Sequence, residues 1–162
     1  MKTIKCTLST KSLKSAVKEL KAYKADVEKK AVVLLDALVA QGVTLAQMNA
    51  SSMSIYDSGA LVNGIVGDIN GNVGYVKSTA PHSIFCEFGT GVKGKNSPHP
   101  DIAILGWTYD TNSHGELGWW YFDEKQQRFR WTKGMPSRPF MYETAELLKS
   151  QVEPIARSVF ND

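Results

Sequence analysis

The chain has 162 residues, of which 22% are charged and 43% apolar, the composition of one soluble globular domain with a core of its own. Its unbroken apolar runs, such as residues 31–35, are too short to span a bilayer, and nothing resembles a secretion signal, so we expect no membrane partner. Cys6 and Cys86 have no Cys-x-x-Cys spacing, and we expect two reduced, buried thiols in a cytoplasmic setting.

The charge is distributed unevenly along the chain. Residues 1–30 have nine lysines and three acidic residues, a net charge of +6, whereas residues 31–162 have a net charge of −3. This asymmetry bears on the partners of the protein more than on its fold.

The first third of the chain predicts one short strand and two helices. Residues 4–8 alternate apolar and polar side chains, as an edge strand does, and Ser9 or Thr10 can cap the helix that follows. Lys24 would fall on the apolar stripe of that helix, which predicts a break or kink between residues 22 and 25. The apolar stripe is Leu13, Val17 and Leu20, and a lysine face about a quarter turn wide is formed by Lys11, Lys14, Lys18 and Lys21.

The second helix is predicted to run from about residue 27 to about residue 49. Its apolar spacing is the same on both sides of Gly42, so we expect the helix to continue there, with the glycine allowing close packing. A loop follows, in which Asp57 can cap a short apolar turn at residues 60–65.

Two hairpins and a last helix complete the predicted elements. Asn70-Gly71 is a type I′ turn pair between residues 65–69 and 72–78, and residues 92–100 are typical of a mobile loop. Aromatic segments at residues 118–122 and 128–132 flank a polar turn and predict cross-strand aromatic pairs. Pro139 suits the first turn of the last helix, which Pro154 should kink or end.

We therefore expect an α+β fold in a single domain spanning residues 1–162. Its parts are helices over residues 10–50, sheet and loops over residues 55–134, and a C-terminal helix over residues 139–159. The amphipathic N-terminal helices would pack on a curved antiparallel sheet with a long aromatic hairpin.

The central stretch is residues 80–91, Ala-Pro-His-Ser-Ile-Phe-Cys-Glu-Phe-Gly-Thr-Gly. Gly89 and Gly91 on either side of Thr90 permit a sharp reversal of the backbone. Glu87 lies between Cys86 and Phe88, and a carboxylate among apolar neighbours needs hydrogen-bond donors or loses its charge. Glu87 is therefore either a functional site or a structural clamp.

Two enzymatic or metal-binding interpretations are weaker than structural ones. Asp57-Ser58-Gly59 resembles the catalytic turn of an aspartic protease, and residues 104–106 imitate that family's second motif, so a homodimer would pair two copies of Asp57. That fold is almost all β, whereas this chain begins with helices, and a capping role for Asp57 is favoured. Metal-ligand spacing is absent among His82, His99, His114, Cys86, Glu87 and Asp101; we interpret the histidines as solvated and Cys86 as a packed thiol, with no metal or cofactor.

Two surfaces remain as candidates for partners. The lysine face could contact phosphates without reading bases, although an ordinary solvated helix face is favoured. The aromatic hairpin could stack bases, but we favour packing on this domain or on a neighbouring subunit.

Three motifs in order resemble one family. Residues 56–65, Tyr-Asp-Ser-Gly-Ala-Leu-Val-Asn-Gly-Ile, resemble the Pro-Val-Asp-Thr-Gly-x-Leu-x-x-Ser-Ile motif of the minor tail-component family of long-tailed phages, also called tail-completion, neck or head–tail joining proteins. Residues 80–91 are similar to its Tyr-Ala-x-Tyr-Val-Glu-Phe-Gly-Thr-Gly motif, and Arg138-Pro139-Phe140-Met141 to its closing Pro-Phe-(Leu/Met) motif. Here Ser58 replaces Thr, Gly64 replaces Ser, the Pro before the Asp turn is missing, and residues 92–134 are longer than in the simplest members.

The resemblance implies a structural virion protein and not an enzyme. It would be assembled in the host cytoplasm and would form a ring of copies at the neck, between the head connector and the tail-terminator or tail-tube proteins, around the path of the DNA. The alternatives are the aspartic-protease-like homodimer with Asp57 and a small DNA-binding protein with the lysine face.

The same resemblance assigns structural roles to the motif residues. Asp57 would cap a turn, Gly59 and Gly89 would allow tight bends, and Glu87 would accept hydrogen bonds from neighbouring backbone or from Arg138. The other motif residues are Phe88, Thr90, Pro139 and Phe140. The candidates for subunit or partner contacts are Trp107, Trp119, Trp120, Trp131 and Lys95, and those for contact with DNA are Lys11, Lys14, Lys18 and Lys21.

Overall fold

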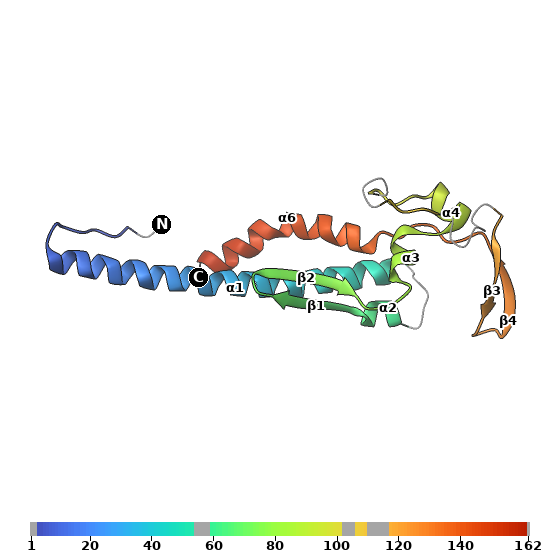
Figure 1. Cartoon of the computed structure of the whole chain (residues 1–162), viewed down its shortest axis with the longest axis horizontal. Coiled ribbons are helices and arrows are strands. Elements are labelled where there is room, and N and C mark those ends of the chain that lie inside the picture. Colours follow the sequence, from blue (N-terminus) through green and yellow to red (C-terminus); the bar gives the residue numbers. More distant parts are fainter. Residues whose placement is uncertain (1–2, 54–58, 102–105, 110–116, 162) are drawn as a thin grey trace.

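The computed structural model describes residues 3–53, 59–101, 106–109 and 117–161 of the chain. Figure 1 shows an elongated molecule with one long helix as its axis, a second helix and a hairpin beside it, and another hairpin at the far end. The class is α+β, as expected. The elements are α1 (Thr10–Ser52), α2 (Ala60–Asn63), β1 (Ile65–Asn70), β2 (Val73–Ser78), α3 (Ser83–Phe88), α4 (Gly91–Asn96), β3 (Trp119–Asp123), β4 (Arg128–Thr132) and α6 (Phe140–Asn161).

Helix α1 is continuous over 43 residues, so the prediction of a break between residues 22 and 25 is wrong. The Ser9 side chain caps it by accepting a hydrogen bond from the backbone N–H of Ser12 at 3.3 Å, as the sequence predicts. Lys24 causes no break because that part of the apolar stripe lies open to solvent. Its ammonium group is exposed and lies 3.6 Å from the Glu28 carboxylate, one turn further along α1.

The second half of α1 packs against α6, β1 and β2. The helix continues through Gly42, which confirms the prediction from the unbroken apolar period, and ends at Ser52. A Cβ atom at Gly42 would lie 2.8 Å from Val76 Cγ2 and 3.3 Å from Leu148 Cδ2. Gly42 therefore lets both the hairpin and α6 approach the backbone of α1 closely.

The β1–β2 hairpin also approaches α1 through glycine. A Cβ atom at Gly67 would lie 2.5 Å from Val39 Cγ1, and one at Gly74 would lie 2.4 Å from Val39 Cγ2. Asn70 pairs with Val73, so the two-residue turn is Gly71-Asn72 and not Asn70-Gly71. Gly71 has φ +60°, whereas Asn72 does not have a positive φ, which is the pattern of a type II′ turn.

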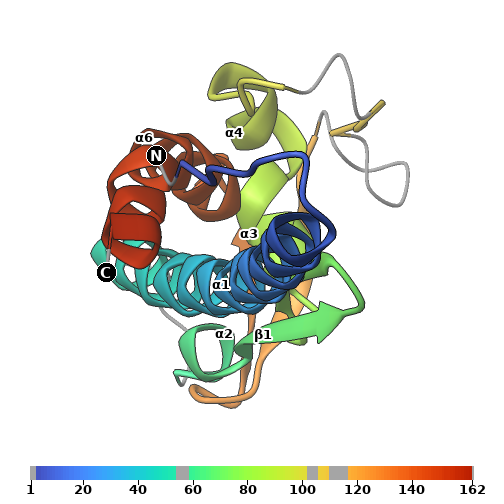
Figure 2. The same cartoon turned by 90° about the vertical axis from the view of Figure 1, so that its left-hand side faces the viewer.

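Residues 4–8 do not form the predicted edge strand. Alternation of side chains stabilises a strand only where a neighbouring strand accepts and donates its backbone hydrogen bonds, and no described strand runs alongside this segment. Figure 2 shows the segment turning back above the start of α1. Cys6 lies in it and is exposed, so the expectation of two buried thiols holds only for Cys86.

Strands β3 and β4 form a second antiparallel hairpin, in a sheet separate from β1 and β2. The ring pairs Trp120–Trp131 and Phe122–Phe129 face each other edge-on across the strands, with centroids 5.5 and 5.3 Å apart. In the turn, a hydrogen bond from the Gln126 amide, and next the Arg130 side chain, hold the pKa of Asp123 below its ordinary value. The described strands thus form two hairpins and not one sheet.

Helix α6 runs antiparallel to α1 and returns along it, as Figure 1 shows. Pro154 does not end it, because the helix continues to Asn161. The proline removes one backbone donor, and Figure 1 shows α6 curving along its length. The Asn49 side-chain amide donates to Thr144 Oγ1 at 3.0 Å, and Gln41 donates to Gln151 at 2.8 Å, so polar contacts fix the register of the two helices.

The core lies where the end of α1, α2, α3 and the start of α6 meet. Phe140 is fully buried and is the largest side chain there. The core cluster is Ala46, Ala50, Leu61, Ile65, Ala80, Cys86 and Phe140. This placement puts the central stretch of the sequence directly against the core.

One helix of the described residues, α1, contains an 18-residue window long and apolar enough to cross a bilayer, with mean hydropathy 1.6 and 17% of the window buried. Length and composition alone satisfy this test. Part of α1 also packs on α6 and on the β1–β2 hairpin, so the helix has protein neighbours along its second half.

We predict that Gly74→Val destabilises the protein by about 1–3 kcal/mol, the usual cost of overpacking. Valine favours strands, so any loss must come from its collision with Val39 and Leu35, which would lie 2.4 and 3.0 Å from the new Cβ atom. Tyr75→Val is the matched control, because Tyr75 is 49% exposed at the next position of β2. Urea unfolding midpoints measure the difference, and equal midpoints for the two variants would contradict the close packing.

Candidate functional site

The central stretch forms α3, then a sharp reversal, then α4. The reversal occurs at Gly89, which has φ +75° and ψ 171°. A Cβ atom at Gly89 would lie 2.5 Å from Ser137 N and 2.9 Å from Met135 O, so the backbone of residues 135–137 passes where a side chain would be. Residues 91–96 form α4, a short helix, so the prediction of a loop over residues 92–100 is wrong in its first half.

Two segments about fifty residues apart in the sequence are joined here through their backbones. Thr90 and Met135 exchange two hydrogen bonds, Thr90 N to Met135 O at 2.9 Å and Met135 N to Thr90 O at 3.1 Å. Arg138 N donates to Cys86 O at 2.9 Å, and the Ser137 hydroxyl donates to Glu87 O at 2.6 Å. The end of α3 and the segment that leads into α6 therefore form one rigid unit.

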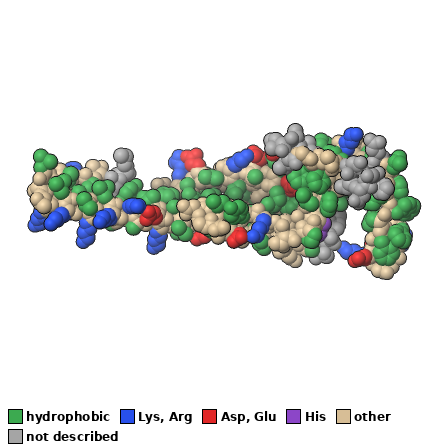
Figure 3. All heavy atoms as spheres, in the orientation of Figure 1, with side chains coloured by type: hydrophobic (Ala, Val, Ile, Leu, Met, Phe, Trp, Pro, Cys, Tyr) green, Lys and Arg blue, Asp and Glu red, His purple; other side chains and the backbone are tan. Residues whose placement is uncertain are grey.

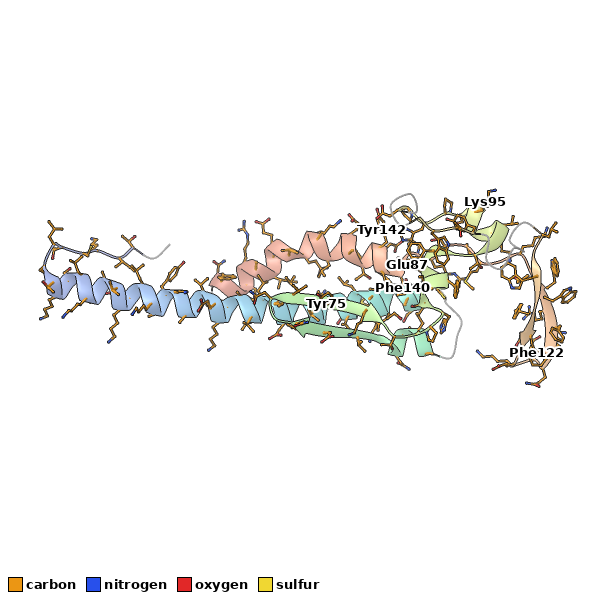
Figure 4. All side chains as sticks on the ribbon, viewed as in Figure 1. Tyr75, Glu87, Lys95, Phe122, Phe140 and Tyr142 are labelled. Carbon is orange, nitrogen blue, oxygen red and sulfur yellow. The ribbon has the colours of Figure 1, made fainter. Side chains whose placement is uncertain are left out.

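The Glu87 carboxylate caps helix α6. It is buried, with 7% exposure, and accepts hydrogen bonds from the backbone N–H groups of Met141 and Tyr142, each at 2.9 Å. These are the second and third residues of α6, whose N–H groups have no acceptor within their own helix. Pro139, which precedes the helix, has no side-chain oxygen. Glu87 thus does from another element what an N-cap side chain does locally, at the positive end of the helix dipole (Figure 4).

His99 is the third donor to this carboxylate. Its Nε2 lies 3.1 Å from Glu87 Oε1, and its Nδ1 accepts from the backbone N–H of Asp101 at 3.0 Å. Since Nδ1 accepts, we assign the ring proton to Nε2, which donates to Glu87. The ring is 3% exposed and packs between Phe88 and Tyr142, with centroids 4.5 and 5.4 Å away.

The interpretation of His99 as a solvated loop histidine is therefore wrong. The flanking prolines indicate irregular backbone but carry no information on where the side chain points. His114 lies outside the described residues.

The Glu87–Arg138 pairing is also wrong. Among the described residues the Arg138 side chain makes no ion pair with Glu87, and Arg138 contributes its backbone N–H to Cys86 O instead. The backbone N–H groups of α6 occupy the positions that the pairing assigned to a guanidinium group. An acid flanked by apolar residues indicates that donors are needed, but it does not indicate which donors supply them.

Glu87, His99 and the start of α6 are here called the clamp. A hollow of about 410 Å³ lies beside the clamp and is lined by Ser83, Asp101 and Met141 among others. Both nitrogens of His99 and both carboxylate oxygens of Glu87 already have hydrogen-bond partners. A general base needs a lone pair within reach of a substrate proton. This arrangement thus favours a structural role for the pair.

The predicted partner-contact residues divide into two groups. Trp107 belongs to the clamp, because its Nε1 donates to Gly89 O at 3.1 Å and its ring stacks on Phe88 at 5.1 Å. Trp119 is half-buried, whereas Trp120 and Trp131 are 64% and 48% exposed. Lys95 on α4 is exposed, as are the four lysines of the lysine face on α1.

The two protease-like motifs lie mostly outside the described residues. Asp57 lies outside the described residues, as do residues 102–105, which hold most of the second protease-like motif. The residue that directly precedes α2 is Gly59, with φ +71°. Within the described ranges, no three side chains of the metal-binding types gather in one place.

Comparison of the chain with protein-family models, with curated proteins and with solved structures finds no match.

We predict that Glu87→Gln destabilises the protein by about 1–3 kcal/mol. Glutamine keeps the shape but replaces one acceptor oxygen with an NH₂ group, which then faces a donor in a buried site. Glu153→Gln is the matched control, since Glu153 is an exposed acid of α6 paired only with Arg157. Thermal and urea unfolding report the change, and equal stability of the two variants would mean that the carboxylate is no clamp.

We predict that Gly89→Ala destabilises more than Gly71→Ala. Both glycines have a positive φ, +75° and +60°, so an alanine is strained at both positions. A Cβ atom at Gly71 would meet nothing within 4 Å, whereas one at Gly89 collides with the backbone of Ser137. A lower unfolding midpoint for Gly89→Ala than for Gly71→Ala is the expected result, and equal midpoints would show that residues 135–137 can move away.

Proposed function

We propose that this chain is a structural subunit of the neck of a long-tailed phage, which joins or completes the tail by assembling with copies of itself. The observation that carries the proposal is the clamp between Glu87 and α6. Its two halves are the second and third motifs of the family resemblance, and each motif residue in it has a backbone or packing role. Such backbone and packing roles support a rigid unit for docking, and none of them involves a chemical reaction.

The exposed aromatic face of the β3–β4 hairpin also supports a protein that works by assembly. Its four residues, on one face of the hairpin, are Trp120, Phe122, Phe129 and Trp131, with exposures between 46% and 68%. A two-stranded hairpin is marginally stable alone, and a contiguous exposed apolar face marks an interaction surface. Figure 3 shows these hydrophobic side chains at the end of the molecule opposite the start of α1.

Assembly would also produce the curved antiparallel sheet that the sequence leads us to expect. Each described hairpin has only two strands, so each has edges whose N–H and C=O groups find no strand within the described chain. Pairing of such edges between neighbouring subunits would make one sheet around a ring. The partners above and below would be the head connector and the tail-terminator or tail-tube proteins.

The lysine face fits a secondary role in the same assembly. Lys11, Lys14, Lys18 and Lys21 are exposed on a helix that projects from the body, where they are free to contact phosphates without regard to base sequence. A lumen-facing position would let packaged DNA slide past. The protease alternative has less support, since the fold begins with a 43-residue helix and the aspartic proteases are almost all β.

Particles made without this protein test the proposal. If a phage that encodes the chain is deprived of it, electron micrographs should show filled heads separate from finished tails. Supplying the wild-type chain or the Glu153→Gln chain should restore joined particles, whereas the Trp120→Ser, Trp131→Ser double variant should not. Normal tailed particles in the absence of the protein would overturn the proposal.

A further inference from the structure

The first part of α1 projects beyond the rest of the molecule. Helix α6 ends beside Lys30, whose Nζ lies 3.5 Å from Phe160 O. Residues 10–29 of α1, here called the arm, therefore extend past α6 and past both hairpins, as Figure 1 shows. At 1.5 Å per residue the arm is about 30 Å long.

The arm has an apolar stripe that its own chain covers only in part: Ala16 is buried and the segment before α1 turns back over its start (Figure 2), but the larger apolar side chains stay about half exposed. Leu13, Val17 and Leu20 are 45%, 50% and 55% exposed, and Tyr23 beside them is 48% exposed. The same helical face continues into the body, where Gly42 contacts Leu148 of α6 and Val76 of β2. The stripe is thus a largely exposed continuation of the face on which α1 packs against its own chain.

The position of the lysines disfavours the simplest covering, an antiparallel pair of arms. Lys14, Lys18 and Lys21 all lie on one flank of the stripe. In a two-fold symmetric antiparallel pair each flank lies beside the same flank of its partner, so lysines would face lysines. Such a pair is disfavoured by like-charge repulsion.

A groove edged by three carboxylates lies between α1 and β1, where the arm meets the body. It consists of two hollows of about 580 and 590 Å³ that share Asp36 and Ile69. Its floor is apolar, with Ile69 and Val32 39% and 60% exposed, and its rim has Glu28, Asp36 and Asp68. Glu28 and Asp68 have lysine partners at 3.6 and 2.7 Å, whereas Asp36 makes no ion pair within the described chain.

We propose that the arm of one copy packs its apolar stripe into the groove between α1 and β1 of a second copy. The lysine flank then lies against the carboxylates of the rim, so that this contact and the DNA contact considered above are alternative uses of the same lysines, and the positive first thirty residues meet the negative remainder of the next chain. The inference rests on the self-assembly in the proposed function and names the surfaces that make it. Because arm and groove are different surfaces, the contact is heterologous and closes into a ring or continues as a filament.

Uncharged substitutions test the stripe without altering the lysines. In the triple variant Leu13→Gln, Val17→Gln, Leu20→Gln, the assembled species should fall to monomer mass by light scattering, with helical content and urea midpoint unchanged. The control variant Ser15→Gln, Ala22→Gln changes exposed residues elsewhere on the arm and should assemble like the wild type.

In the groove, Asp36→Lys should weaken assembly at least tenfold, and Glu153→Lys on α6 should not.

Disulfide trapping tests the pairing itself. In a Cys6→Ser background, Val17→Cys and Val32→Cys chains are mixed and oxidised; covalent dimers should join one chain of each kind. Dimers of two Val17→Cys chains would show arm against arm and overturn the inference, as would a wild-type protein that stays monomeric.

Unchanged assembly by the triple variant would overturn the arm contact while leaving the neck role standing. Normal tailed particles without the protein would remove the neck role and leave the arm contact standing.

Discussion

The buried carboxylate of Glu87 is the constraint on which the rest of this structure depends. A helix that starts directly after a proline without its own cap leaves N–H groups unsatisfied, and Glu87 satisfies two of them from an element fifty residues away. The cap of α6 therefore forms only when α3 and the start of α6 lie together. Phe140, fully buried at the same junction, couples that capping to the formation of the core.

The clamp requires glycines because the joined segments are bonded through their backbones. Gly134 shows this most clearly, since a Cβ atom there would lie 1.9 Å from Thr90 O. His99 then closes the site by using both ring nitrogens. Each of these contacts holds the Glu87 carboxylate and the His99 ring in fixed positions, as a structural junction requires.

Local signals in the sequence predicted most of the regular elements, because helix periodicity and turn residues act over short stretches of chain. The continuation of α1 through Gly42 follows from its apolar period, the two hairpins from their turn residues and aromatic segments, and the start of α6 from Pro139. The wrong predictions concern residues whose conformation depends on which other parts of the chain lie next to them. Lys24 breaks no helix because its side chain is exposed to solvent, and residues 4–8 form no strand because no strand of the described residues lies beside them.

The sequence predicted that the Glu87 carboxylate needs hydrogen-bond donors, but not which groups donate to it. An acid between apolar residues requires donors, and the sequence left a functional site and a structural clamp open for Glu87. Neither the N–H groups of α6 nor His99 could be found by spacing, since their contacts join residues twelve to fifty-five apart. The same limit explains the arm and the aromatic hairpin. Their apolar patterns satisfy the rules for buried faces, although the folded chain leaves both exposed at opposite ends of an elongated body. An apolar face that its own chain leaves exposed is a candidate surface for contact with a second chain, and this is the common basis of the contacts proposed for the arm and the aromatic hairpin.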